Sequence, residues 1–206
     1  FIDYLKNHYL AKKTIVCVAG EKGKVELAEK MIEKYFRGMP VGRAGTKRKT
    51  VEHQKSPSSF FYFKKTDQSH LILGVRAYHA LHKDRYALAL LSTILGGYMS
   101  SRLWLEVREK RSLAYYINTI LELCTDTGFL GVRAGVDNSR IPEAIESILS
   151  EFKKISKNGP SSQELQKAKN YIKGSTQLSL ESSDEVASFF GTQEVLKERI
   201  LTPQQL

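Results

Sequence analysis

The sequence predicts an α+β fold in which helices pack on a mainly antiparallel sheet. Segments rich in alternating or β-branched apolar residues come in adjacent pairs joined by short turns, a pattern typical of antiparallel strands. Segments with apolar residues at helical spacing lie between and after these pairs. The chain has 206 residues, of which 41% are hydrophobic, and this is enough for one core. We therefore expect residues 1–206 to form a single α+β domain.

The first half of the chain predicts helices alternating with short strands. The expected elements are a helix ending near residue 9, a strand at 14–19, a helix at 24–37 and strands at 60–65 and 69–78. Residues 38–59 hold glycines, prolines, serines and the triplet Lys47-Arg48-Lys49, so we expect a long surface loop there. Because the chain starts at Phe1 inside a helical pattern, we expect it to be part of a longer protein.

The second half predicts paired strands followed by long helices. The expected elements are a helix at 86–95, a helix from 100 or 101 to about 111, strands at 114–123 and 128–136, and helices at 141–155, about 161–180 and about 184–198. Ser100 or Ser101 is suited to cap the second of these helices. Ser161 and Glu164 have the spacing of a capping box at the start of a long helix.

Charge and cysteine content restrict the partners only weakly. The net charge of +10 is spread over separate clusters with no aromatic-interleaved stripe, so we favour solvated surface charge and expect neither nucleic acid nor membrane as a partner. Nucleic-acid binding through Lys47-Arg48-Lys49 is an alternative that predicts steeply salt-dependent binding. Cys17 and Cys124 lie inside apolar segments, so we expect buried free thiols, which slightly favours the cytoplasm.

No residue pattern in the chain supplies a catalytic centre by itself. The sequence contains no H-x-x-E-H, H-E-x-x-H or G-x-S-x-G motif, no P-loop and no paired-cysteine motif. His79 and His82 are three residues apart but have few acidic residues near them, so we favour surface histidines over zinc ligands. We therefore expect no catalytic residue and no metal ligand in this chain.

The most informative stretch is residues 91–117. It contains Leu-Gly-Gly-Tyr-Met-Ser-Ser-Arg-Leu at 95–103 and Val-Arg-Glu-Lys-Arg-Ser-Leu-Ala-Tyr at 107–115. This run resembles a motif of the pitrilysin/insulinase and mitochondrial processing peptidase family of zinc metallopeptidases, the inverzincins. Residues 4–9 with 14–20 look like the beginning of the second domain in this family, and residues 178–187 resemble its late helices. The resemblance covers most of the chain.

The resemblance implies a half-molecule built from two related α+β domains with different roles. The first domain of a family half-molecule carries the H-x-x-E-H zinc motif, and the second carries no metal. Two halves close like a clamshell around a peptide. An arginine and a tyrosine, seven residues apart, bind the substrate from the half opposite the zinc, and the matching positions here are Arg108 and Tyr115. A guanidinium and a phenol are suitable donors to a peptide backbone and to a developing oxyanion.

We therefore expect the substrate-binding C-terminal domain of a zinc-dependent metalloendopeptidase that cleaves peptides or unfolded segments. The parent protein would bind zinc through an N-terminal domain, and this chain alone would hold no cofactor and be inactive. Its partners would be a peptide, that N-terminal domain and a second half-molecule in a homo- or heterodimer. The alternative is a non-catalytic partner or structural subunit related to processing-peptidase or respiratory-complex core proteins. Ser112 and Tyr98 depart from the family pattern, which usually has glycine at the first position and often at the second.

Overall fold

The structure is a computed structural model that describes residues 1–43, 45–196 and 199–205. These residues divide into two compact units. One unit, here called the helical unit, is formed by Phe1–Lys49 with Lys173–Leu206, and the other, the sheet unit, by Thr50–Ile172. The sheet unit contains every strand of the described residues and the whole motif at 91–117. It is therefore the unit that positions the expected site.

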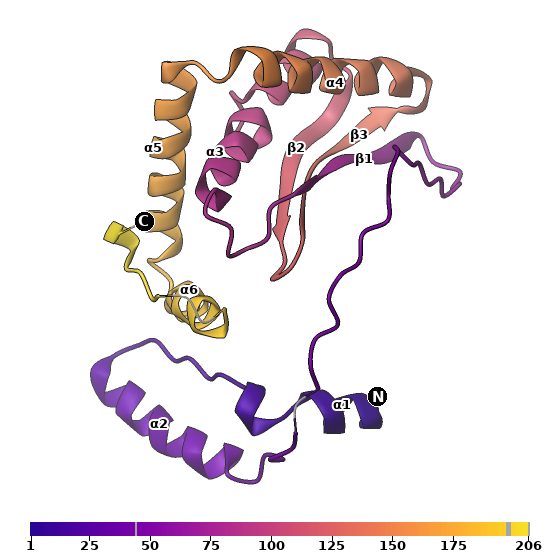
Figure 1. Cartoon of the computed structure of the whole chain (residues 1–206). Coiled ribbons are helices and arrows are strands. Elements are labelled where there is room, and N and C mark those ends of the chain that lie inside the picture. The colour runs from indigo at the N-terminus through magenta and orange to yellow at the C-terminus, as the bar shows by residue number, and fades with distance from the viewer. Residues whose placement is uncertain (44, 197–198, 206) are drawn as a thin grey trace. The chain divides into compact units, whose positions relative to one another are not determined.

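The sheet has three antiparallel strands in the order β1-β3-β2 (Figure 1). They are β1 (Gln68–Ala77), β2 (Ala114–Leu123) and β3 (Gly128–Asp137), and β3 pairs with both of the others. Alternate residues of the central strand point to the core and are at most 3% exposed: Leu130, Val132, Ala134 and Val136. The expected α+β class and these three strands are confirmed.

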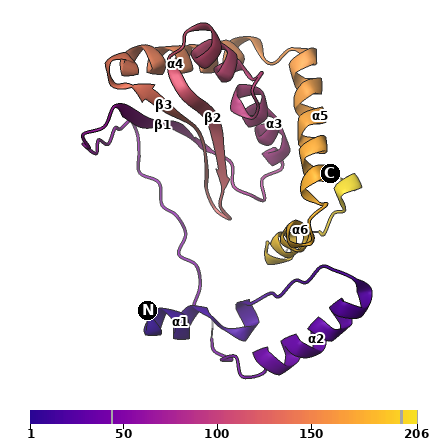
Figure 2. The ribbon, with the colours of Figure 1, turned by 180° about the vertical axis from the view of Figure 1, so that it is seen from behind.

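Two helices of the sheet unit pack against neighbouring strands of the sheet. α3 (Arg85–Gly96) contacts β2, and α4 (Ile141–Asn158) contacts β3; Figure 2 shows them from behind. Ala144, Ile148 and Ile155 of α4 are buried because residues four and seven apart lie on one side of a helix. The expected helices at 86–95 and 141–155 are confirmed, and α5 (Ser162–Ser179) follows α4.

The helical unit contains α1 (Ile2–His8), α2 (Lys22–Phe36), the C-terminal part of α5, and α6 (Ser183–Val195). The N–H of Ala11 donates to the carbonyl of Pro40 at 3.0 Å, and Leu10 beside it is 2% exposed. The expected end of the last helix, at residue 198, lies outside the described residues. None of the helices described here is long and apolar enough to cross a lipid bilayer.

The strands expected at 14–19 and 60–65 are absent, so these two predictions were wrong. Neither segment is hydrogen-bonded into a ladder. The aromatic side chains of residues 60–63 are 84–92% exposed. The physical reason is that a strand needs a neighbouring backbone to satisfy its N–H and C=O groups and a surface to bury its apolar face. A run of β-branched or aromatic residues has the side chains typical of a strand, but it does not by itself provide a neighbouring backbone to pair with.

Both cysteines are exposed, which corrects the expectation of buried thiols. Cys17 lies in the first of the two segments that form no strand. Cys124 follows the last residue of β2, where its N–H donates to the carbonyl of Thr127 at 2.9 Å and closes the hairpin turn. A turn faces solvent whatever the apolar character of the strand that leads into it.

α3 approaches β2 closely at its last residue, Gly96. A Cβ atom at this position would stand 2.7 Å from the backbone nitrogen of Thr119 and 2.9 Å from its methyl group. The hydroxyl of Thr119 in turn donates to the carbonyl of Ser92 at 2.9 Å, which ties the helix to the strand. Gly96 is therefore needed for the packing distance and does more than end a helix.

The capping box that opens α5 is confirmed and extends into an ion pair. The hydroxyl of Ser161 accepts the N–H of Glu164 at 3.2 Å, and the Glu164 carboxylate accepts the N–H of Ser161 at 2.8 Å. The guanidinium of Arg102 donates to both carboxylate oxygens, at 2.6 and 2.9 Å. These Arg102 bonds are the main reason that the pKa of Glu164 falls from 4.5 to about 2. The hydrogen bonds from Ser161 lower the pKa further, and partial burial opposes the shift.

We expect Glu164→Gln to lower the free energy of unfolding by about 1–2 kcal/mol at pH 7. The loss is modest because the Arg102–Glu164 pair is partly exposed and solvent screens it. Because the folded-state pKa is depressed, the stabilisation is complete above the unfolded value of 4.5 and is lost as pH falls through about 2. Urea unfolding at pH 7 and pH 2.5 measures this stabilisation. The difference in free energy of unfolding between wild type and Glu164→Gln should be smaller at pH 2.5. An equal gap at both pH values, or the same loss in the exposed control Glu146→Gln, would contradict this.

We expect Gly96→Ala to cost about 1–3 kcal/mol of unfolding free energy, because the added methyl group forces α3 and β2 apart. Gly174→Ala is the matched control. A Cβ atom there meets nothing within 4 Å, and alanine in a helix is preferred over glycine by about 0.5–1 kcal/mol. Thermal unfolding should therefore shift downward for the first variant and upward for the second. Shifts of the same sign would show that the close approach is not limiting.

Candidate functional site

The helix that carries the Val-Arg-Glu-Lys-Arg part of the motif is a π-helix, Trp104–Lys110. The carbonyl of Ser101 accepts the N–H of Leu105 at 3.0 Å, an α-helical bond that leads into the π-helix. The Ser101 hydroxyl itself is buried and has no hydrogen-bond partner among the described residues, so it does not cap the helix as expected. π-helical turns are rare and concentrate at functional sites.

The turn after the π-helix places Ser112 in the left-handed region, with φ of 51°. The N–H of Ser112 donates to the carbonyl of Arg108 at 3.0 Å, and the N–H of Leu113 to that of Val107 at 2.9 Å. Each bond reaches one residue further back than in an ordinary Schellman turn, as the wider π-helical ring requires. The left-handed conformation gives a physical reason for the glycine that the family usually has at this position.

Arg108 projects from the π-helix and lies over the ring of Trp104, with its guanidinium carbon 4.0 Å from the ring centroid. Its neighbours Lys110 and Arg111 both bind Glu106, at 3.1 and 3.0 Å. Arg108 has no carboxylate within ion-pair distance in the described part of the chain. The stacking fixes the direction of the guanidinium and leaves its donors available to a ligand.

Tyr115 lies at a β-bulge at the start of β2. Ala114 pairs with Val136 and Tyr116 with Gly135, so Tyr115 between them has no partner in the ladder. A bulge of this kind re-aims a side chain, and bulges are common next to active sites. Tyr115 is 62% exposed, and its hydroxyl has no hydrogen-bond partner in the residues that the structure describes. The hydroxyl of the next residue, Tyr116, is instead 2.9 Å from a ring nitrogen of His70.

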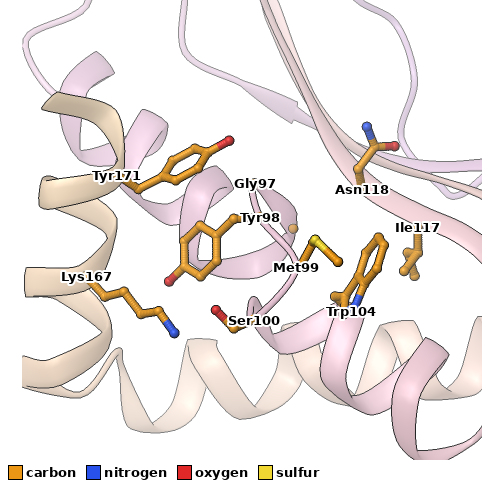
Figure 3. Close-up of a pocket in the computed structure, with 10 residues that line it drawn as sticks. Gly97, Tyr98, Met99, Ser100, Trp104, Ile117, Asn118, Lys167 and Tyr171 are labelled. Carbon is orange, nitrogen blue, oxygen red and sulfur yellow. The ribbon is translucent and has the colours of Figure 1, made fainter. Parts of the chain in front are cut away.

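A cavity of about 600 Å³ lies beside β2 at the end of α3, and it is called the Tyr98 cavity here (Figure 3). Its ten lining residues come from the Gly-Gly turn, the π-helix, β2 and α5: Gly96, Gly97, Tyr98, Met99, Ser100, Trp104, Ile117, Asn118, Lys167 and Tyr171. The ring of Tyr98 lies 5.1 Å from the ring of Tyr171, and the ammonium of Lys167 is 5.4 Å from the Tyr98 centroid. Burial and the negative charge of Glu164 raise the pKa of Tyr98.

A second cavity of about 420 Å³ shares Trp104, Ile117 and Asn118 with the first. Tyr116 and Arg133 complete its lining, and the guanidinium of Arg133 donates to the Asn118 side chain at 2.8 Å. β2 is an edge strand, because the order of the sheet is β1-β3-β2. Ile117 and Asn118 of this strand line both cavities, so the two cavities adjoin each other along β2.

The structure places the two site residues predicted from the sequence on either side of an exposed turn and two buried residues that follow it. Leu113 and Ala114 between them are 2% and 7% exposed. No hydrogen bond or cation–π contact joins Arg108 to Tyr115 in the described chain. Neither residue lines either of the two cavities described above, but Arg108 stacks on Trp104, which lines both.

Lys167 and Tyr171 are cavity residues that the sequence analysis did not find. They are four residues apart and therefore lie on one side of α5, which is a visible signal. However, the sequence does not say that this side of α5 faces the Gly-Gly turn. Tyr98 was noted only as a departure from the family pattern, and its ring forms a wall of the cavity.

The described residues offer no ligand set for a metal ion. No group of three or more histidine, cysteine, aspartate or glutamate side chains lies close enough together to hold one. The ring of His82 stacks on Tyr78 at 3.9 Å, and a ring nitrogen of His82 is 3.8 Å from Asp84. What the site can supply is hydrogen-bond donors, aromatic surface and an open strand edge.

The sequence of this chain is similar to known proteins along most of its length. The family described as the peptidase M16 inactive domain matches residues 1–172. The chain is 31% identical over 195 residues to the uncharacterised zinc protease YmxG of Bacillus subtilis, covering 94% of this chain and 46% of that protein. An uncharacterised zinc protease of Mycobacterium leprae is 30% identical over 189 residues, covering 91% of this chain and 42% of that protein. The chain therefore spans less than half the length of these relatives.

Solved structures share the fold. The peptidase M16 inactive domain of Pseudomonas fluorescens superposes with a TM-score of 0.70 at 23% identity, covering 85% of this chain and 41% of that one. A chain of complex III2 from Candida albicans gives a TM-score of 0.63 at 16% identity, covering 90% and 45%. The family resemblance that residues 91–117 predicted is confirmed by the family match over residues 1–172 and by the sequence relatives, and the solved structures agree in fold.

We expect Ser112→Gly to raise the free energy of unfolding by about 0.5–1 kcal/mol. The left-handed conformation costs a non-glycine residue about 1–2 kcal/mol, and the greater freedom of glycine in the unfolded chain offsets part of the gain. Ser150→Gly, at an exposed position inside α4, is the matched control and should lose about 0.5 kcal/mol. Urea unfolding of both variants measures the two signs. A loss of stability in Ser112→Gly would show that the turn is not strained.

Proposed function

Because the chain belongs to the peptidase M16 family and matches its inactive domain, we propose that it is the substrate-binding C-terminal domain of a zinc-dependent metalloendopeptidase. The substrate is a peptide or an unfolded segment. We propose that zinc is bound by another part of a longer protein, because the relatives are named zinc proteases and this chain covers less than half of their length. The role of this chain is to bind the peptide and to orient its scissile bond.

The observation that carries the proposal is the availability of Arg108 and Tyr115. Their neighbours are occupied, because Lys110 and Arg111 bind Glu106 and Tyr116 contacts His70. Arg108 and Tyr115 themselves have no polar partner among the described residues, and each lies at a local irregularity of the backbone, a π-helix for Arg108 and a bulge for Tyr115. Donors fixed in this way bind a peptide carbonyl at little cost in conformational entropy.

The outer edge of β2, which pairs with no further strand in the part of the chain that the structure describes, suggests how the peptide binds. An extended peptide can add to an exposed strand through main-chain hydrogen bonds, while its alternate side chains enter pockets on the two faces. Both cavities adjoin this edge strand at Ile117 and Asn118. The same arrangement would bring the peptide past Trp104, on which Arg108 is stacked.

We further propose that residues 1–206 act as one domain of the parent protein, beside an N-terminal zinc-binding domain and a second half-molecule in a homo- or heterodimer. The exposed aromatic run at 60–63 supports this, because apolar side chains that are 84–92% exposed favour burial against another surface. The chain by itself is expected to be inactive.

The second candidate is a non-catalytic partner or structural subunit. The match to a chain of complex III2 is the observation in its favour, although at 16% identity this likeness concerns the fold alone. The two candidates differ in one feature of the parent protein. An H-x-x-E-H motif in the N-terminal half favours the peptidase, and its absence favours the partner or structural subunit.

We expect Arg108→Ala to lower kcat/KM of the full-length protein on a peptide substrate by about 100-fold, because it removes a fixed donor to the polarised carbonyl. Tyr115→Phe should cost about 10-fold or more, since it removes one hydrogen bond. Peptide cleavage assays and metal analysis measure activity and zinc content together.

The matched controls are Arg37→Ala and Tyr35→Phe, which remove the same groups from α2 and its end. They should leave kcat/KM within about twofold. If Arg108→Ala and Tyr115→Phe keep zinc, fold and full activity, the substrate-binding role is wrong. If the wild type is inactive and free of metal, the second candidate is correct.

A further inference from the structure

The Tyr98 cavity has a cationic end and an apolar end. In Figure 3 the ammonium of Lys167 and the hydroxyl of Ser100 lie at one end with the ring of Tyr98, and Trp104 and Ile117 lie at the other. Lys167 is the only charged residue among the ten that line the cavity. A ligand that fills the cavity therefore meets one positive charge and a largely aromatic wall.

The charge of Lys167 is not neutralised within the described part of the chain. No carboxylate lies within ion-pair distance of its ammonium, whose one close contact is the ring of Tyr98 at 5.4 Å. The nearest acid along α5, Glu164, is held by Arg102 at 2.6 Å. A lysine that stands over an aromatic ring with no acidic partner is well placed to bind a carboxylate of a ligand.

We infer that the Tyr98 cavity is a specificity subsite for a peptide segment in which Asp or Glu stands next to a large apolar residue. The carboxylate binds the ammonium of Lys167, and the apolar side chain packs between Tyr98 and Trp104. This inference rests on the peptide-binding function proposed above and names the class of substrate for it. It assigns Lys167 and Tyr98 as specificity-determining residues.

The position of the cavity favours an internal acidic residue over a free C-terminus. Ile117 and Asn118, which line the cavity, lie inside β2 (Ala114–Leu123) and not at its end. A peptide that pairs with this edge continues in both directions beyond the cavity. The side chain of Asp or Glu reaches Lys167 without ending the chain, whereas a terminal carboxylate would forgo half of the main-chain pairing.

Tyr98 makes the subsite selective. With glycine at this position the cavity would lose the ring that contacts both Tyr171 and Lys167. The ring narrows the space and supplies one face against which an apolar side chain can stack. Chains with glycine at this position would keep the turn but lack this wall.

The test measures binding of fluorescent peptides to the full-length protein, with a chelator present to prevent cleavage. Three acetylated and amidated peptides are identical except for Glu, Gln or Lys before a central Phe. A fourth peptide is the Gln version with a free C-terminal carboxylate directly after Phe. The variants are Lys167→Gln and Lys167→Glu, with Lys169→Gln, an exposed lysine of α5 outside the cavity, as control.

We expect the wild type to bind the Glu peptide about 10-fold more tightly than the Gln peptide, and the Lys peptide most weakly. Lys167→Gln should abolish the preference, so that the Glu and Gln peptides bind equally, and Lys167→Glu should reverse the preference toward Lys. Lys169→Gln should bind as the wild type does. High salt should reduce the preference, because a partly exposed ion pair is screened.

Other outcomes overturn the inference in distinguishable ways. Equal binding of the Glu and Gln peptides, or an unchanged preference in Lys167→Glu, shows that peptides bind but the Tyr98 cavity does not select for acid. The strongest binding by the peptide with the free carboxylate shows that the cavity recognises chain ends. If none of the four peptides binds, the proposed peptide-binding function fails and the subsite with it.

Discussion

The close approach of α3 to β2 at Gly96 is the constraint on which the rest of the site depends. Because Gly96 has no side chain, the helix reaches the backbone of Thr119, and the chain must then turn at once. The turn places Tyr98 and Met99 beside the strand that α3 has just met. The buried residues Val107 and Leu113 anchor the π-helix that follows, and its end leads directly into β2. Packing of apolar residues thus fixes the polar groups around it.

Several of the elements that the sequence predicted well have partners close along the chain, although β1 was also predicted and pairs with the distant β3. The hairpin of β2 and β3 joins two alternating segments through one short turn, and α4 carries its apolar residues at helical spacing. The capping box of Ser161 and Glu164 depends on residues three positions apart. In each case the information lies within about twenty residues, so periodicity and spacing are sufficient.

The failures concern features that depend on distant partners. The segments 14–19 and 60–65 have the composition of strands, but no neighbouring backbone pairs with them in the described residues. Arg108 and Tyr115 were found through a family resemblance and not through spacing, since nothing local marks a π-helix or a bulge. Lys167 joins the Tyr98 cavity only because α5 returns past the Gly-Gly turn, and no local pattern predicts that.

The central claim is that this domain binds a peptide through the donors and cavities around the start of β2. The most direct measurement is a crystal structure of the full-length protein with an uncleaved peptide bound. We predict an extended peptide along the edge of β2, with the Arg108 guanidinium and the Tyr115 hydroxyl about 2.7–3.2 Å from peptide oxygens. A peptide that contacts neither side chain and leaves the edge of β2 free would contradict it.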